Sequence, residues 1–256
     1  GADEMFGGYE RYRRTMIFAG IPIKTRLILT RLLDILSTYI DRLSINKSIQ
    51  DKLIKINYLL KKKNEIELYE EICSLGIGLD IGKNSFTNGI EKIKAMYQES
   101  NDILIYCMQS DLDHYLTEDI LVKADRASMR YSLEVRSPFL NPSIVDSAFG
   151  YNSNYLSDCF VGKKPLREIA SKIFHKSLIQ RKKKGFAVPL NSWLRKPLEK
   201  WSYERIYDSF LTNKGIINKD LVHRIYQENL NGSRNWSHQL WALIMFEEWY
   251  RNSNQN

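Results

Sequence analysis

Apolar residues recur every three to four positions through most of this chain, which is the spacing of helices that bury one face. In the first half this pattern predicts helices over residues 25–40, 48–63, 65–75, 87–97 and 102–112. Further helices are expected from Thr117, from Pro142 and from Pro165, with two or three more over residues 193–250. The sequence therefore predicts a mainly helical chain.

The stretch 116–142 combines a predicted helix with a predicted extended segment. Thr117 is a favourable N-cap, and Asp119 and Lys123, four positions apart, are expected to form an ion pair. One face of this helix should be buried in the core, and it consists of Ile120, Ala124, Ala127 and Tyr131.

After Ser132 the pattern changes to alternation, which places Glu134 and Arg136 on one side of an extended segment. Pro138 excludes a continuing helix. Asn141 followed by Pro142 predicts a new helix, with the N-cap followed by the first helical position.

The composition is typical of a globular protein, with 43% hydrophobic and 27% charged residues among 256, enough for one large domain or two small ones. No run is long and apolar enough to span a membrane, and no signal peptide is recognisable, so a cytoplasmic protein is expected. Three widely spaced cysteines, an odd number, argue against a disulfide framework and against a zinc site. They are expected to be buried, reduced thiols.

The formal net charge of +8 favours an anionic partner, either a nucleic acid or a small molecule such as a nucleotide. The basic residues are spread along the predicted helices instead of being gathered in a tail, which weakens the case for nucleic acid. The densest basic run is residues 181–184, and four adjacent cations are tolerated only in water or opposite an anion.

The first residues read GADEMFGGYERYRR and join an acidic pair, Asp3 and Glu4, to a glycine pair, Gly7 and Gly8. Two adjacent glycines break a helix and allow a ligand or another part of the chain to approach the backbone closely. By itself, a glycine-rich turn with two acids is more often an ordinary surface turn than a binding site.

Four segments together resemble the synthetase domain of glutamine-hydrolysing asparagine synthetases. The segments are GADEMFGGYERY at residues 1–12, DRASM…SLEVRSPFL at 125–140, GKKPLR at 162–167 and RKKKGFAVP at 181–189. The resemblance implies that Asp3 holds magnesium on the ATP phosphates, that Gly1 and Glu4 belong to the same nucleotide site, and that Lys183 is the catalytic lysine. It also suggests that the wall of the site is formed by Asp125, Arg126, Glu134 and Arg136.

By this resemblance, the chain is the C-terminal portion, residues 1–256, of an asparagine synthetase domain. That domain is an α/β nucleotide α-hydrolase-like (PP-loop ATPase) fold, and most of its parallel sheet would lie outside these residues. The N-terminal glutaminase domain and the ATP-binding S-G-G-x-D-S loop are not found in the sequence. We therefore expect the 256 residues alone neither to hydrolyse glutamine nor to make asparagine.

The implied reaction uses ATP and Mg²⁺ to adenylate the aspartate side chain, and ammonia from glutamine then gives asparagine, AMP and pyrophosphate. The expected partners are these small molecules and the missing N-terminal part, and the resemblance allows a homodimer of the complete enzyme. One alternative is a related ATP-dependent amidotransferase or lactam-forming enzyme acting on another acid, such as a surface sugar or a peptide. Another is a non-catalytic, basic helical module that binds nucleic acid.

Overall fold

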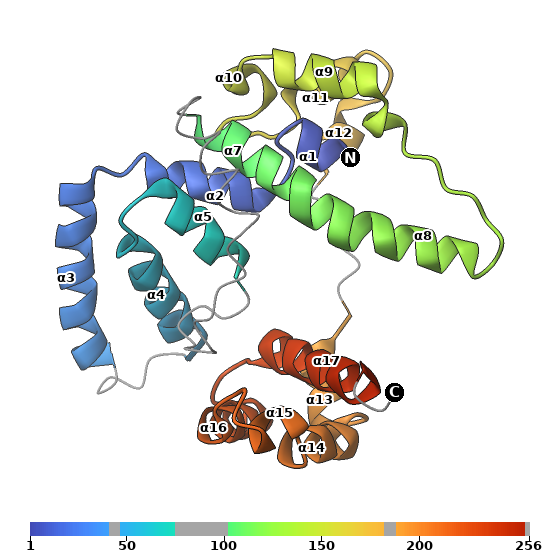
Figure 1. The fold of residues 1–256 in the computed structure, drawn as a ribbon. Helices are drawn as coiled ribbons and strands as arrows, with labels where there is room; N and C mark the ends of the chain where they lie inside the picture. The colour runs from blue at the N-terminus through green and yellow to red at the C-terminus, as the bar shows by residue number, and fades with distance from the viewer. Residues whose placement is uncertain (41–46, 75–101, 182–187, 254–256) are drawn as a thin grey trace. The chain divides into compact units, whose positions relative to one another are not determined.

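The computed structural model describes residues 1–40, 47–74, 102–181 and 188–253 (Figure 1). Within these ranges every regular element is a helix and none is a strand, so the prediction of a mainly helical chain is confirmed there. The chain forms two compact units. The first unit comprises residues 1–26, 62–73 and 86–183, and the second comprises residues 27–61, 74–85 and 184–256. None of the described helices has the length and apolarity needed to cross a membrane.

The first unit is built around α2, which packs against α5 and α7. Its core is rich in aromatic and sulfur-containing side chains and comprises Met5, Phe6, Tyr12, Tyr69, Leu104, Tyr106, Cys107, Met108, Ala148 and Leu156. The described helices of this unit are α1 (Ala2–Met5), α2 (Glu10–Ala19), α5 (Glu65–Cys73), α7 (Ile103–Ser110), η1 (Asp111–Ile120), α8 (Leu121–Met129), η2 (Pro138–Leu140), α9 (Pro142–Gly150), α10 (Ser153–Leu156), α11 (Lys164–Ser171) and α12 (Lys176–Ile179).

Three of these elements, α7, η1 and α8, form one continuous helix (Figure 1). It begins at Asp102, whose carboxylate accepts hydrogen bonds from the backbone N–H groups of the next turn. The middle segment η1 is π-helical, and the Leu121 N–H accordingly donates to the carbonyl of Leu116, five residues back. Thr117 lies inside this helix and donates to the Asp113 carbonyl. The prediction that a helix begins at Thr117 is therefore wrong, because the upstream cap at Asp102 already starts it.

The predicted buried face of α8 is also wrong. Ala124 and Ala127 are exposed, and Tyr131 keeps 74% of its surface accessible. The long helix is buried only as far as Leu116, because the other described elements of the first unit pack against α7 and η1. The predicted pair of Asp119 and Lys123 does form, at 2.8 Å.

The helix starts predicted at prolines are confirmed. Asn141 caps α9 by accepting from the Ser143 N–H, and Pro142 is the first residue of that helix. Pro165 is the second residue of α11. Both prolines stand in the first turn, where a missing N–H costs the helix nothing.

The second unit contains two groups of helices. Most of α3 (Ile23–Ile40) belongs to it, together with α4 (Lys47–Leu60), and Asp34 on α3 binds Asn57 and Lys61 of the α4 region. The helix predicted over 87–97 lies outside the described residues. The other group comprises α13 (Leu190–Arg195), α14 (Glu199–Tyr207), α15 (Phe210–Asn213), α16 (Lys219–Leu230) and α17 (Ser237–Ser253).

The C-terminal helix α17 buries Leu240 and Ile244 in the core of the second unit. It also buries Glu247, whose carboxylate accepts hydrogen bonds from the Ser209 hydroxyl and from the backbone N–H groups at the start of α15. Burial alone would raise the pKa of Glu247, but these hydrogen bonds and Arg251 lower it below its ordinary value. The buried charge of Glu247 in α17 is thus explained by its hydrogen bonds to the free N–H groups at the start of α15.

Candidate functional site

Two glycine turns meet in the first unit, one after α1 and one before α11. The Lys163 N–H donates to the Phe6 carbonyl at 3.0 Å, which joins the two turns. A Cβ on Gly162 would lie 2.6 Å from the Gly7 carbonyl oxygen, closer than real Cβ contacts come. Gly7 itself has φ +62, and a Cβ there would lie 2.7 Å from the Ser157 side chain. The close backbone approach expected at Gly7 and Gly8 is therefore made by another part of the chain.

An acid and a lysine face each other across this junction. The Nζ of Lys163 lies 2.9 Å from Oδ1 of Asp3, and the side chains are 27% and 19% exposed. A Cβ on Gly8 would lie 2.1 Å from Cε of Lys163 and 2.3 Å from Oδ1 of Asp3. The space that this ion pair occupies therefore exists only because residue 8 is glycine.

The turn that carries Lys163 is fixed by Asp158. Its Oδ1 accepts from the N–H groups of Phe160 and Val161, at 2.7 Å each, and its Oδ2 pairs with Lys164. The hydrogen bond from Lys164 and those from the two backbone groups lower the pKa of the Asp158 carboxyl to about 2. A turn held in this way can keep Lys163 in the left-handed conformation, φ +58, that aims it at α1.

The second acid of the motif, Glu4, is buried beside Asp3. Its Oε1 accepts a hydrogen bond of 2.6 Å from the Tyr9 hydroxyl, and its Oε2 lies 2.9 Å from the Gly1 nitrogen. Burial alone would raise the pKa of Glu4, and the hydrogen bond from Tyr9 acts in the opposite direction by stabilising the charged carboxylate. The site thus brings two carboxylates of α1 close to the ammonium group of Lys163 on the turn before α11.

An aromatic and ionic cluster lies behind Glu4. The guanidinium of Arg11 donates twice to Oδ2 of Asp111, at 2.9 and 2.5 Å, and the Tyr12 hydroxyl donates to the same oxygen. The guanidinium carbon of Arg11 also lies 4.2 Å from the centre of the Tyr9 ring and 4.3 Å from that of Tyr115. This arrangement joins α2 to the π-helical segment η1.

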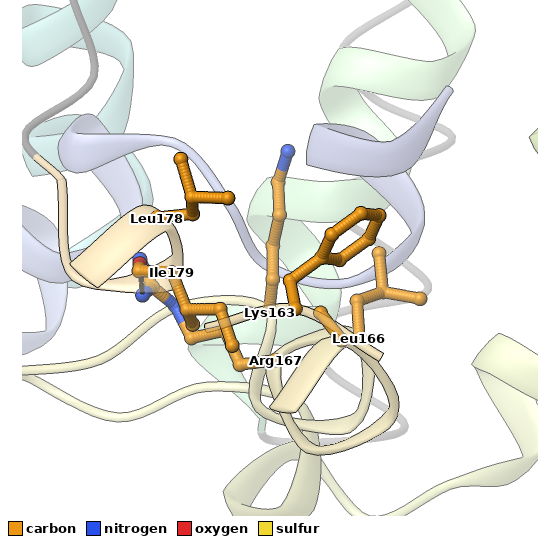
Figure 2. A pocket seen from close by; sticks show the side chains of 7 residues that line it. Lys163, Leu166, Arg167, Leu178 and Ile179 are labelled. Carbon is orange, nitrogen blue, oxygen red and sulfur yellow. Dashed lines mark hydrogen bonds between the residues drawn. The ribbon is translucent and has the colours of Figure 1, made fainter. Parts of the chain in front are cut away.

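An open pocket of about 410 Å³ adjoins the lysine (Figure 2). Figure 2 shows the Lys163 side chain with Leu178 and Ile179 on one side and Leu166 on the other. Arg167 donates to the carbonyls of Gly162 and Ile179, so it links the turn that carries Lys163 to the end of α12. The remaining lining residues are Ala170 and Phe174.

The structure brings together some of the predicted site residues. Gly1, Asp3 and Glu4 share one turn of chain, as described above. The four residues of the predicted wall are exposed. Asp125 and Arg126 lie on α8, and Glu134 pairs with Arg136 in the extended segment that follows. Lys183 lies outside the described residues.

Three residues of the site were given no role by the sequence analysis: Lys163, Tyr9 and Asp111. Lys163 and Tyr9 stand in the GKKPLR and FGGY segments, so the motifs located them without indicating what they contact. Asp111 belongs to none of those motifs, and only its burial among hydrogen-bond donors identifies it. The cysteine prediction is corrected as well, because only Cys107 is buried, while Cys73 is exposed and Cys159 is intermediate; all three are free thiols.

The groups around Asp3 fit a metal ion that takes one ligand from the protein and most of the others from a bound phosphate. Among the residues that the structure describes, no group of three or more His, Cys, Asp or Glu could hold a metal ion without other ligands. Asp3 offers one carboxylate in the space kept open by Gly8, next to a cation that can face phosphate oxygens. Mg²⁺ commonly binds in this way, with one or two carboxylates and substrate phosphates.

An acidic helical turn and a lysine thus meet between two glycine turns, and comparison with known proteins gives the family of the chain. The chain belongs to the asparagine synthase family, whose sequence model matches residues 1–251. No solved structure matches the chain.

Among its relatives is the Bacillus subtilis protein named asparagine synthetase [glutamine-hydrolyzing] 1, 28% identical over 260 residues. That alignment covers 98% of this chain and 39% of the relative. A Mycobacterium bovis protein, provisionally assigned as a glutamine-hydrolysing asparagine synthetase, is 33% identical over 141 residues, which are 55% of this chain and 21% of that protein. The chain thus spans well under half the length of these relatives.

Proposed function

We propose that this chain is the C-terminal part, residues 1–256, of the synthetase domain of an ATP-dependent, glutamine-hydrolysing asparagine synthetase. Family membership and the likeness of almost the whole chain to the named Bacillus enzyme support the proposal. In the complete enzyme, the glutaminase domain and the PP-loop with most of the parallel sheet would come from the other part of the protein. The 256 residues alone would then be inactive.

The observation on which the proposal rests is the Asp3–Lys163 pair in its glycine-lined space. The aspartate side-chain carboxylate is a poor electrophile, whereas its adenylate is a good one. Forming the adenylate from ATP requires that developing charge on the phosphates be neutralised by fixed cations. A carboxylate that can take a metal and a lysine beside it are the two kinds of group that this step needs.

Each predicted residue has a role in this proposal. Asp3 would hold Mg²⁺, which supplies Lewis-acid neutralisation of the phosphates when it is bound. Glu4 and the Gly1 backbone would shape the same end of the nucleotide site. Lys163 would stay within reach of phosphate oxygens once Asp3 has a second partner, and Lys183 would steady charge on the phosphates and the reacting acyl group.

The acceptor side of the site is also part of the proposal. Asp125, Arg126, Glu134 and Arg136 would form a wall near the bound aspartate, and ammonia released from glutamine would displace AMP. These four side chains are exposed in this chain, so the wall would be completed by the rest of the domain. Small molecules, the remaining part of the protein and a second copy of the complete enzyme are the proposed partners.

The decisive experiment uses the complete protein with ATP, Mg²⁺ and glutamine, and measures pyrophosphate release with aspartate and, in parallel, with other carboxylic acids. Aspartate-dependent pyrophosphate and asparagine are expected for the wild type, and Asp3→Asn and Lys183→Met should lose both. Lys172→Met removes an exposed lysine that pairs with Glu168 across one helical turn, so this control should stay active. Pyrophosphate release that depends on another acid would indicate a related amidotransferase or lactam-forming enzyme. Release with no acid would overturn the proposal.

A further inference from the structure

Tyr9 connects the acidic turn to a cluster of side chains on α2 and η1. Its hydroxyl donates to Glu4, while three other side chains surround its ring. The Arg11 guanidinium lies 4.2 Å from the ring centre, and the rings of Tyr12 and Tyr115 stand edge-on at 5.5 and 5.8 Å. A ring held in this way has one orientation, so its hydroxyl has one position.

Arg11 is itself fixed by a buried acid. Asp111 is only 4% exposed, and its Oδ2 receives two N–H groups of Arg11 and the hydroxyl of buried Tyr12. Hydrogen bonds between a guanidinium and a carboxylate are strong and directional. The plane of the Arg11 guanidinium is therefore set by Asp111, and the guanidinium carbon also lies 4.3 Å from the Tyr115 ring centre.

Asp111 and Tyr115 both reach Arg11 from the π-helical segment η1. Asp111 begins η1 and Tyr115 follows four residues later, a spacing that places both side chains on one face of the helix. Arg11 is therefore held on one side by the Asp111 carboxylate and on another by the Tyr115 ring.

We infer that Arg11 and Asp111 are positioning residues that act through Tyr9 to fix the acidic turn for the metal-bound phosphates of ATP. The inference rests on the proposed function, because it concerns what Asp3 and Glu4 hold. The acidic turn α1 has four residues and no side-chain cap, and a helix so short has little stability of its own. Its side chains are therefore oriented by contacts such as the one between Tyr9 and Glu4.

The test measures ATP binding to the complete enzyme by calorimetry, with and without Mg²⁺ and with no acceptor acid present. Tyr9→Phe keeps the ring and removes the hydroxyl, and Arg11→Lys keeps the charge and removes the planar group. Each should weaken binding in Mg²⁺ by about 10-fold or more, the usual effect of losing a group that orients a metal ligand. Binding without Mg²⁺ should change little in either variant.

Two further comparisons separate positioning from general damage. Tyr115→Phe retains the ring face against Arg11 and should bind like the wild type, whereas Tyr115→Leu should be weakened like Arg11→Lys. Arg14→Lys is the matched control, since Arg14 is on the same helix and pairs with Glu10 in solvent. It should leave binding unchanged.

The inference is overturned if Tyr9→Phe binds ATP in Mg²⁺ as the wild type does. It is also overturned if the variants weaken binding equally with and without Mg²⁺, because the effect would then not pass through the acidic turn. A different result would contradict the proposed function itself: neither the wild type nor Arg14→Lys would then bind ATP in a Mg²⁺-dependent way. The inference about Arg11 and Asp111 would be overturned as well.

Discussion

Replacing Gly8 by alanine tests the site with the smallest possible change. The new methyl group would lie 2.1 Å from Cε of Lys163 and 2.3 Å from Oδ1 of Asp3. Both atoms belong to side chains that can move, whereas the third neighbour, the Cα of Asp3 at 3.0 Å, is backbone and needs only a small shift. Gly8→Ala should therefore separate the ion pair and leave the fold in place.

The cost to stability follows from these contacts. An ion pair of this exposure contributes about 1 kcal/mol or less, and the crowding against Asp3 adds a cost of about 1 kcal/mol, the low end for overpacking. We expect a loss of about 1 to 2 kcal/mol, which for a chain of this size lowers the melting temperature by about 2 to 8 °C. The effect on function should be larger, about 10-fold or more in Mg²⁺-dependent ATP affinity, because Asp3 loses its orientation.

The assay is calorimetric titration of the complete enzyme with ATP in Mg²⁺, together with thermal unfolding followed by circular dichroism. Gly150→Ala is the matched control, since a Cβ at Gly150 meets nothing within 4 Å. It should change neither measurement. A Gly8→Ala variant that melts lower but binds ATP normally would refute the link between the Asp3–Lys163 geometry and the nucleotide.

Three other predictions concern the rest of the chain. Glu247→Ala should destabilise the protein to urea by about 3 kcal/mol, because it leaves the Ser209 hydroxyl and the Leu211 N–H buried without this acceptor. Glu248→Ala, at a half-buried position on the same helix, should cost less. By NMR, Asp158 should titrate near pH 2, below its ordinary value of 3.8. Since its folded-state pKa is the lower one, its stabilising effect should be complete above about pH 4 and be lost towards pH 2, and Asp158→Asn should abolish this dependence. Cys107, fully buried and with a pKa raised well above the ordinary value by burial, should be alkylated only on unfolding, whereas Cys159 should react in the native protein.

Local sequence patterns predicted the helices well, because helix periodicity and proline positions are local properties. Asn141–Pro142 and the Asp119–Lys123 pair are examples, since both depend on residues within one turn. Burial was predicted less well. Ala124, Ala127 and Tyr131 were expected in the core and are exposed, because a periodic apolar face does not reveal whether another element covers it.

The candidate site, too, could be predicted from the sequence only where it depends on neighbouring residues. The acidic pair and the glycines were recognisable in the sequence, but the partner of Asp3 was not, because Lys163 lies far along the chain and contacts Asp3 only through the folded junction. The buried acceptor Asp111 was missed for the same reason. The predicted wall residues and Lys183 remain predictions that the complete enzyme can test.

The junction of the two glycine turns also bears on how the protein is made. Asp3 leaves the ribosome near the start of this chain, and Lys163 follows only after most of the first unit has been synthesised. Until then the acidic turn lacks the Lys163 ammonium opposite Asp3 and the second glycine turn against which Gly7 and Gly8 pack. Nascent and truncated chains that end before Lys163 therefore lack the Asp3–Lys163 pair on which the proposed nucleotide site depends.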